Sequence, residues 1–475
     1  RPTVMLTALL LVLGGACSAR TPTVIDGAFD DWDDAPVASD PAGDGGRMDL
    51  LTIAVASNAE RVSFLFELAD EINLQSTAGL RLEVTTAVGS EEPRLVWDFG
   101  AKRGRIQTGG RSIEVGQWDL GMLKAPTVSS RRFEFSFLRC TRDGTMIVEG
   151  ESAAVTLVDA AGGDRLPDTG RLHVELPASR LPDPPPVRLE RDDPRHVRVL
   201  TWNVLFEGLF KRPAPFLRVL RAIEPDVICF QEVWSHTARQ AADQVSLALP
   251  GTQWHGAHTT DGLIVSRYPF LEAAAIDEAG NYWALIDLPD GHYDVDLSVV
   301  SAHPPCCDQE KRRQEQLDGM AAWLRMLKEP DGVSVPWGTP TVVAGDMNLV
   351  GGSIQLETLL AGRIVGEERH GPSHDPDWDG TALRDADPRI TGRRENYTWR
   401  DRETAFAPGK LDYIVFTDSV LEMGNAFVLA TEHMRPEDLD RYGLLADDTV
   451  EASDHLPVVA DLTPTGERPR RAPGE

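Results

Sequence analysis

A run of prolines near the middle of the chain divides it into two parts. Residues 181–186 read LPDPPP, and proline fixes φ and lacks a backbone N–H, so this run suits neither a helix interior nor a central strand. We expect a stiff linker over residues 181–195. The length of 475 residues exceeds what one hydrophobic core usually holds, which also favours two domains.

The two parts differ in hydrophobic pattern. Residues 61–67 (RVSFLFE) and 132–137 (RFEFSF) alternate with a period of two, which predicts an all-β sandwich over residues 20–180. After the linker, strands alternate with helices. The helices and strands that carry this expectation are a helix over 213–223, a buried strand over 227–233 and a longer helix over 308–327. This alternation predicts a layered α/β domain over residues 196–463, followed by a disordered tail over 464–475.

The first residues resemble an export signal over 1–19. Arg1 precedes an apolar run at 4–13 and small residues that end in Cys17, and the run is too short to span a bilayer. One interpretation is a lipoprotein signal with Cys17 as the lipid-modified residue, and the other is cleavage after Ala19. The chain does not begin with Met, so we expect its start to lie upstream. Both interpretations predict an exported bacterial protein, either an outer-membrane lipoprotein or a periplasmic or extracellular protein.

Charge limits the partners. The chain has 47 basic and 75 acidic residues, a formal net charge of -28, which disfavours tight binding of duplex nucleic acid. A phosphate ester bound at a local cationic site remains compatible with this charge, as does loosely held nucleic acid. We expect membrane contact only through a lipid anchor. Disulfide connectivity is left open, although Cys229 lies in an apolar stretch and is expected to be a buried thiol.

Polar residues recur where the predicted strands of the second domain end. A lone Asp, Asn or His at such a place is more often a turn former or a satisfied polar group. Six separate strands ending this way are difficult to attribute to turns. The residues concerned are Asn203, Glu232, His303, Asp346 with Asn348, Asp412, and Asp454 with His455.

The motifs around these residues resemble those of the endonuclease/exonuclease/phosphatase superfamily, in the expected order from about residue 196 to 463. The matching stretches are TWNV at 201–204, FQEV at 230–233, SRYP at 266–269, AHP at 302–304, GDMN at 345–348, LDYI at 411–414 and SDHLP at 453–457. Members include type I deoxyribonucleases, abasic-site endonucleases, neutral sphingomyelinases and inositol-polyphosphate 5-phosphatases. The resemblance implies a DNase I-like four-layer α/β sandwich with the active site where strands end.

The resemblance also implies roles. Glu232 would be the principal Mg²⁺ ligand, with Asn203 and Asp454 completing a hydrated site that Mn²⁺ could also occupy. Asp346 would orient or deprotonate the attacking water, and Asn348 would hold a phosphate oxygen.

Two histidines carry the proton chemistry that the resemblance implies. His455 would donate to a non-bridging oxygen or serve as the base instead. His303 would pair with Asp412 and protonate the leaving oxygen.

Departures from the family pattern bear on the substrate. Many nuclease relatives carry Arg before the strand that here begins at Asn281, and this chain lacks that Arg. The long polar segment 351–396 is expected to form a loop over the site. Arg393 and Arg394 in that segment would bind a substrate phosphate or be solvated surface groups. A phospholipid-cleaving relative would expose an apolar loop, but residues 421–429 have the pattern of an ordinary strand.

The first domain carries fewer sequence signals of function than the second. Its opening, IDGAFDDW at 25–32, resembles the family 9 carbohydrate-binding-module-like sandwiches, which implies an accessory role and a glycan as partner. Asp40, Asp44 and Asp49 would hold Ca²⁺ or would be solvated turn residues. The alternative to an Mg²⁺-dependent phosphoesterase is a non-catalytic surface binding protein on a degenerate scaffold. Retention of every motif acid, amide and histidine counts against that alternative.

Overall fold

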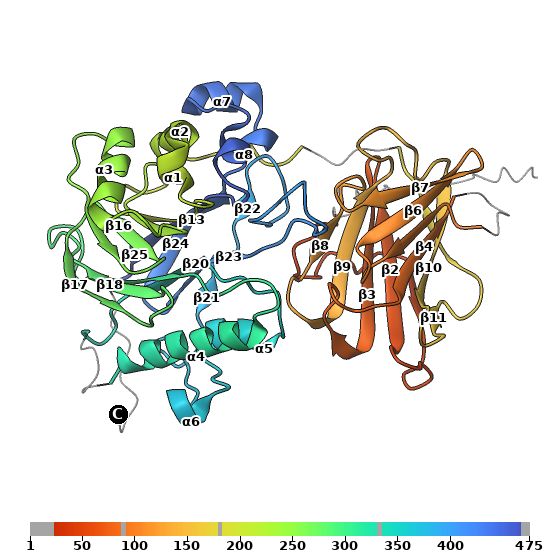
Figure 1. Cartoon of the computed structure of the whole chain (residues 1–475), viewed down its shortest axis with the longest axis horizontal. Helices are drawn as coiled ribbons and strands as arrows, with labels where there is room; N and C mark the ends of the chain where they lie inside the picture. The colour runs from red at the N-terminus through yellow and green to blue at the C-terminus, as the bar shows by residue number, and fades with distance from the viewer. Residues whose placement is uncertain (1–22, 87–91, 179–182, 330–334, 467–475) are drawn as a thin grey trace, which may run out of the picture.

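The computed structural model describes residues 23–86, 92–178, 183–329 and 335–466. The predicted export signal therefore lies outside the described residues, as does most of the predicted tail. The described residues contain two β-rich halves that lie side by side (Figure 1). No helix among them is both long enough and apolar enough to cross a membrane.

The first half is a sandwich, as its period-two pattern predicts. Its described residues form two sheets with the orders β1-β2-β3-β9-β8 and β11-β10-β4-β5-β6-β7, and β12 also pairs with β10. The strands are β1 Val37–Ser39, β2 Leu50–Ser57, β3 Arg61–Ile72, β4 Leu80–Thr85, β5 Leu95–Asp98, β6 Arg103–Thr108, β7 Arg111–Gly116, β8 Leu123–Ala125, β9 Ser130–Leu138, β10 Ser152–Asp159, β11 Arg165–Leu166 and β12 Leu172–Glu175.

Aromatic pairs between β3 and β9 fill the sandwich core. The antiparallel register places Phe64 opposite Phe135 and Phe66 opposite Phe133. The rings of Phe64 and Phe135 stack with centroids 4.8 Å apart, and all four side chains are buried. Such cross-strand pairs fix the register, because a shift by one residue would move every ring to the other face.

The second half has two further sheets, with the orders β15-β16-β14-β13-β25-β24-β22 and β17-β18-β19-β20-β23-β21 among its described residues. The strands are β13 Val197–Asn203, β14 Val227–Gln231, β15 His255–His258, β16 Leu263–Ser266, β17 Phe270–Ala275, β18 Tyr282–Ile286, β19 Leu297–Ala302, β20 Thr341–Asp346, β21 Arg384–Asp385, β22 Arg389–Ile390, β23 Asp412–Phe416, β24 Leu421–Val428 and β25 Val458–Pro464. The helices are α1 Gly208–Lys211, α2 Pro213–Ile223, α3 Ala238–Ala248, α4 Glu310–Met326, α5 Ile354–Ala361, α6 Glu367–His370, α7 Pro436–Tyr442 and α8 Asp448–Ala452, with a 3₁₀ turn at Thr431–His433.

Three apolar layers separate the sheets and helices of this half. One cluster fills the space between the sheets, a second lies between β13–β14 and the helices α2 and α3, and a third lies between β19–β20 and the helices α4 and α5. The central strands β13 and β20 are buried along their whole length because both of their faces are covered. The predicted four-layer DNase I-like sandwich is confirmed, and so are the helices at 213–223 and 310–326.

The segment 351–396 corrects one expectation. It was predicted as a loop over the site, but it contains α5, α6, β21 and β22. Leu359 and Trp378 of this segment pack into the cluster beneath α4, outside the second sheet. Its apolar residues at 354–361 therefore pack against the outer face of the second sheet, beside α4.

The two halves share a buried interface. Trp32 and Leu65 of the sandwich belong to the same apolar cluster as Tyr397 and Ala386 of the α/β half. Asp26 Oδ2 forms an ion pair with Arg389 Nη1 at 2.8 Å across the junction. Arg393 and Arg394 also lie near this junction: Arg393 pairs with Glu395 at 3.9 Å, and Arg394 donates to the Asp183 carbonyl.

The aspartate cluster of the sandwich differs from the predicted set. Carboxylate oxygens of Asp40, Asp44 and Asp168 lie within 4.8 Å of one another. Asp49 instead accepts the backbone N–H groups of Gly43 and Gly45 at 2.8 and 3.0 Å. Asp49 is thus a turn residue, and the Ca²⁺ site stays a prediction.

Lys124 of β8 lines a cavity between the two halves together with Asp385 and Lys410, and it gives a pH-dependent test of this interface. Burial, with a smaller contribution from Lys102, lowers its pKa from 10.5 to about 7, so the folded protein binds this proton less readily than the unfolded chain. The resulting loss of stability is complete below about pH 7 and vanishes above about pH 10.5. We expect Lys124→Met to raise Tm at pH 6 and to leave it unchanged at pH 10.5, with exposed Lys311→Met as the control. An equal rise at both pH values would contradict this account.

Candidate active site

Asp346 is the centre of the polar residues at the strand ends. It is the last residue of β20 and is only 1% exposed. Its Oδ2 atom accepts a hydrogen bond from Asn203 Nδ2 at 3.1 Å and lies 3.5 Å from Nε2 of both His303 and His455. Because β13 faces β20 across the inter-sheet core, residues from both sheets reach this carboxylate.

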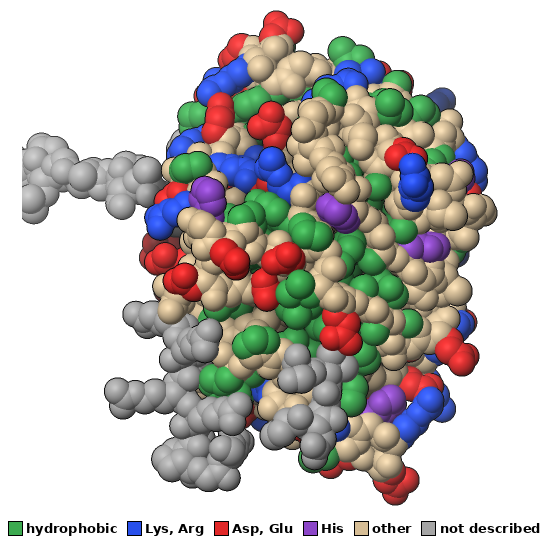
Figure 2. Space-filling model, turned by 90° about the vertical axis from the view of Figure 1, so that its left-hand side faces the viewer, with side chains coloured by type: hydrophobic (Ala, Val, Ile, Leu, Met, Phe, Trp, Pro, Cys, Tyr) green, Lys and Arg blue, Asp and Glu red, His purple; other side chains and the backbone are tan. Residues whose placement is uncertain are grey.

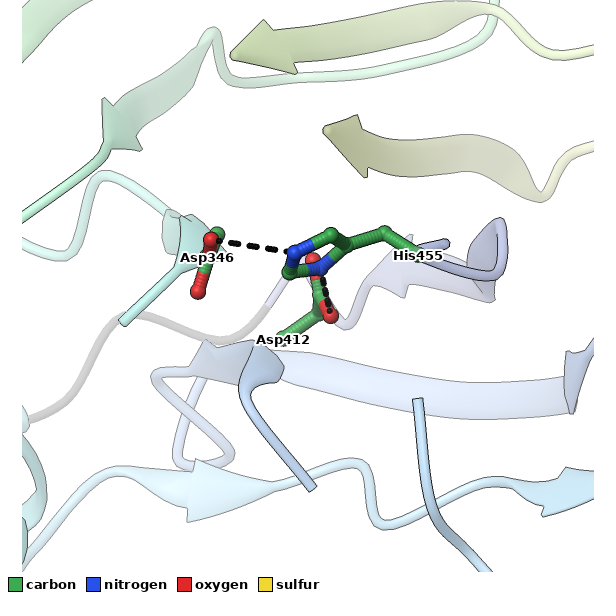
Figure 3. Close-up of side chains that lie close together, drawn as sticks. All are labelled: Asp346, Asp412 and His455. Carbon is green, nitrogen blue, oxygen red and sulfur yellow. Dashed lines mark hydrogen bonds and ion pairs between the residues drawn. The ribbon is translucent and has the colours of Figure 1, made fainter. Parts of the chain in front are cut away.

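Each histidine has its own carboxylate partner on the opposite ring nitrogen. His455 Nδ1 lies 2.9 Å from Asp412 Oδ2, and Figure 3 shows the ring between Asp412 and Asp346. His303 Nδ1 lies 2.7 Å from Asp261 Oδ2. The predicted pair of His303 with Asp412 is therefore wrong, because β23 brings Asp412 to the histidine of the last motif.

Asp261 was missed by sequence reasoning. It lies between β15 and β16 and directly before Gly262, where an Asp-Gly pair indicates an ordinary turn. Its carboxylate also accepts the backbone N–H of Glu232 at 2.8 Å. The available signal was its position just before the buried strand β16, since Asp412 likewise lies at the start of a buried strand. Asn281 is a second residue that sequence reasoning did not assign to the site: its Oδ1 accepts the His303 backbone N–H at 2.9 Å.

The charges of the site alternate. Burial opposes the imidazolium of His455, but Asp412 and Asp346 outweigh it and raise the pKa of His455 to about 10. His303 follows the same pattern: burial opposes the charge, but Asp261 and Asp346 hold its pKa well above the usual range. Burial raises the pKa of Asp412 to about 6. Burial also acts to raise that of Asp346, but both imidazoles together lower it. At neutral pH these directions give an ionised Asp346 between two protonated rings.

The predicted metal ligands lie beside this centre. Asn203 Nδ2 also lies 3.1 Å from Glu232 Oε1, and Glu232 Oε2 accepts the Phe206 backbone N–H at 2.6 Å. Glu232 follows the last residue of β14 directly. Its φ of 65° is a left-handed conformation that is uncommon for residues other than glycine. Asp454 accepts from Trp399 Nε1 at 3.0 Å, and the neighbouring Ser453 donates to the Asn203 carbonyl at 2.8 Å.

The donor chemistry fits a hard divalent cation on the Glu232 side. Glu232 and Asp454 are partly exposed carboxylates. The Asn203 amide nitrogen faces both Glu232 and Asp346, and its oxygen accepts the Leu205 backbone N–H at 3.0 Å. The Asn203 oxygen would reach a cation beside Glu232 only if the amide turned and exchanged these contacts. Asp346, Asp412 and His455 also lie close enough together to hold a metal ion. However, both nitrogens of His455 face carboxylates, and a metal-ligating imidazole must be deprotonated at the ligating nitrogen.

Asn348 follows Asp346 at the end of β20. Its backbone N–H donates to Asp346 Oδ1 at 3.1 Å, and its Nδ2 donates to the Pro304 carbonyl at 3.0 Å. Asn348 therefore ties the strand that carries Asp346 to the loop that follows His303. A disulfide between the neighbours Cys306 and Cys307 closes the next part of that loop, whereas Cys229 is a buried thiol as predicted.

The new pairing predicts which variants are coupled. His303→Ala and Asp261→Asn should be strongly non-additive in kcat, because Asp261 Oδ2 orients the His303 ring, while the oxygen of asparagine can still accept the Glu232 backbone N–H that Oδ1 binds. His303→Ala and Asp412→Asn should be closer to additive, since they belong to different pairs. Two double-mutant cycles measured with one phosphodiester decide this. Stronger coupling of His303 to Asp412 than to Asp261 would contradict the geometry.

The ends of strands in two facing sheets bring together five acids, three amides and two histidines. Residues 200–455 match the sequence model of the Endonuclease/Exonuclease/phosphatase family. This match covers more than half of the chain, and the chain belongs to that family. A search of curated proteins finds no match.

Proposed function

We propose that the protein is a divalent-metal-dependent phosphoesterase that hydrolyses its substrate by in-line attack of water. The observation that carries the proposal is Asp346, a buried carboxylate held between two histidines that each have a second carboxylate behind them. Membership in a family of phosphoesterases and nucleases supports the same reaction class.

The protein residues divide the chemistry among them. Asp346 orients the attacking water and accepts its proton, because a carboxylate with a lowered pKa is ionised at neutral pH. His455, protonated and backed by Asp412, donates to a non-bridging phosphate oxygen. His303, backed by Asp261, donates to the leaving oxygen, and the Asn348 amide contacts a phosphate oxygen.

Glu232, Asn203 and Asp454 would hold Mg²⁺, with Mn²⁺ as a substitute. When bound, the ion neutralises negative charge on the phosphate group. The three side chains supply carboxylate and amide oxygens, which match the preference of Mg²⁺ for oxygen ligands.

The substrate is more compatible with a small or single-stranded phosphodiester than with a duplex. Residues 187–475 have 29 basic and 48 acidic residues, which gives 29 − 48 = −19. Figure 2 shows acidic and basic side chains dispersed around a band of hydrophobic side chains on the outer face of this half. The net negative charge of this half repels a polyanion over a long range.

Two exposed aromatic side chains lie next to the metal side of the site. Phe206 and Trp234 are 59% and 45% exposed, with ring centroids 5.9 Å apart. The Phe206 backbone N–H donates to the Glu232 carboxylate, and Trp234 follows Glu232 by two residues. We infer that these rings contact the part of the substrate beyond the phosphate.

This contact predicts a selective effect on substrate binding. Phe206→Ala with Trp234→Ala should raise KM about 10-fold for a single-stranded dinucleotide, because stacking of a base on an aromatic ring contributes about 1–3 kcal/mol. The KM for the matching dinucleotide that lacks its bases should change little. Steady-state kinetics with both substrates measures the difference. Equal losses would mean that the rings do not read the base, and a loss confined to phospholipid vesicles would make them a membrane contact.

We also propose that the chain is exported through the signal at residues 1–19 and that the sandwich binds a glycan. The reaction itself is tested by a panel of DNA, RNA, sphingomyelin, phosphatidylinositol, inositol phosphates and bis-(p-nitrophenyl) phosphate, each with Mg²⁺ and with EDTA. Mg²⁺-dependent release of product from at least one ester supports the proposal. Absence of hydrolysis across the panel would favour the alternative of a binding protein on a phosphoesterase scaffold.

A further inference from the structure

The segment that follows Asn348 is held by the sandwich. Three consecutive backbone carbonyls of this segment accept hydrogen bonds from the other half of the chain. Leu349 O accepts from Thr127 Oγ1 at 2.7 Å, Val350 O from Asn73 Nδ2 at 2.9 Å, and Gly351 O from the Ser129 backbone N–H at 2.8 Å. Buried carbonyls need such partners, so the catalytic half alone would leave these groups unpaired or hydrated.

Thr127 connects two catalytic strands. Its hydroxyl is also 3.3 Å from the carbonyl of Lys410, two residues before Asp412. One side chain on the loop between β8 and β9 thus lies against the end of β20 and the start of β23. The side of the sandwich that carries β8 faces the α/β half in Figure 1.

The fit around Thr127 is close. A Cβ atom added at Gly409 would lie 2.7 Å from Thr127 Cγ2, so the site accepts only glycine without movement. Gly409 in turn exchanges backbone hydrogen bonds with Trp399, whose indole donates to Asp454. Next to Thr127, Val128 is buried in the same cluster as Met347 and Leu349 on either side of Asn348.

We propose that the sandwich is part of the catalytic scaffold and that Thr127 is a positioning residue for Asn348 and Asp412. The Thr127 hydroxyl contacts the backbone carbonyls of Leu349 and Lys410 and not the side chains of Asn348 or Asp412, so it acts by fixing the backbone beside those two residues. The proposal rests on the proposed function for its effect on turnover. Its structural part, immobilisation of residues 347–353 by the sandwich, is independent of any activity.

Thr127→Val in the full chain tests the positioning role, because valine keeps the shape and removes only the hydroxyl donor. We expect kcat to fall about 10-fold with little change in KM, since small displacements of catalytic groups cost up to about 10²-fold. Thr127→Ser retains the donor and should restore most of the rate. Asp26→Asn weakens a different contact across the same junction and should leave kcat near the wild-type value.

Hydrogen exchange separates the two proposals. In Thr127→Val, backbone amides of residues 347–353 should exchange faster than in the wild type, and those in Thr127→Ser should not. Unchanged hydrogen exchange in Thr127→Val would overturn the immobilisation of residues 347–353 by the sandwich, whether or not the protein is active. Faster exchange with unchanged kcat would overturn the positioning role of Thr127. If the wild-type protein cleaves no ester, the proposed function is overturned, but hydrogen exchange still decides whether the sandwich immobilises residues 347–353. Thr127→Ala replaces the valine variant if the latter does not fold.

Discussion

Asp346→Asn is expected to lower kcat by about 10²- to 10⁴-fold, the range for loss of a general base. The amide keeps the size of the carboxylate but cannot accept the proton of the attacking water. It also removes the negative charge that helps to hold both His303 and His455 in their protonated forms. Steady-state kinetics on a phosphodiester at saturating Mg²⁺ measures the loss.

A matched control lies beyond the other end of the neighbouring strand. Asp418 is exposed just after β23, whereas Asp412 begins that strand at the active site. Asp418→Asn makes the same chemical change and should retain wild-type kcat. A similar small loss in both variants would show that Asp346 is not the base and that its role is structural.

Glu232→Gln is expected to remove most activity through the metal. The substitution keeps the side-chain length and replaces a charged ligand with a neutral one, so Mg²⁺ should bind much more weakly. Isothermal titration calorimetry with MgCl₂ reports the affinity without reference to turnover. Raising the Mg²⁺ concentration should recover part of the activity.

Glu224 provides the control for backbone strain. Like Glu232 it has a positive φ, of 53°, but it is exposed at the end of α2. Glu224→Gln should therefore leave both Mg²⁺ binding and turnover unchanged. Wild-type Mg²⁺ affinity in Glu232→Gln, together with lost turnover, would exclude Glu232 as the metal ligand.

The sequence predicted the strand ends of the site better than the contacts between them. Asp346 stands out because it ends a continuous apolar run, and His455 because it directly precedes one. Neither pattern needs knowledge of neighbours in space. Which acid meets which histidine depends on the order of strands within each sheet and on the approach of the two sheets. That is why His303 was assigned to Asp412, although the structure pairs it with Asp261.

The relation between the two halves could not be read from the sequence for a similar reason. The proline run correctly indicates a change of fold class, but a linker says nothing about whether the flanking domains pack together. Contacts such as Thr127 with Leu349 join residues separated by 222 positions. No local pattern around Thr127 distinguishes it from an ordinary loop residue, and the same holds for the α5 region, where polar neighbours obscured a short helix.

The most direct test of the proposed chemistry is the initial rate of bis-(p-nitrophenyl) phosphate hydrolysis as a function of Mg²⁺ concentration, measured for the full chain, Glu232→Gln and Asp346→Asn. We expect saturable activation of the wild type that EDTA abolishes. Activation of Glu232→Gln should shift to higher Mg²⁺, and Asp346→Asn should bind Mg²⁺ but turn over slowly at every concentration. Hydrolysis that is unaffected by EDTA, or that persists at the wild-type rate in Asp346→Asn, would contradict the assignment of a metal-dependent phosphoesterase centred on Asp346.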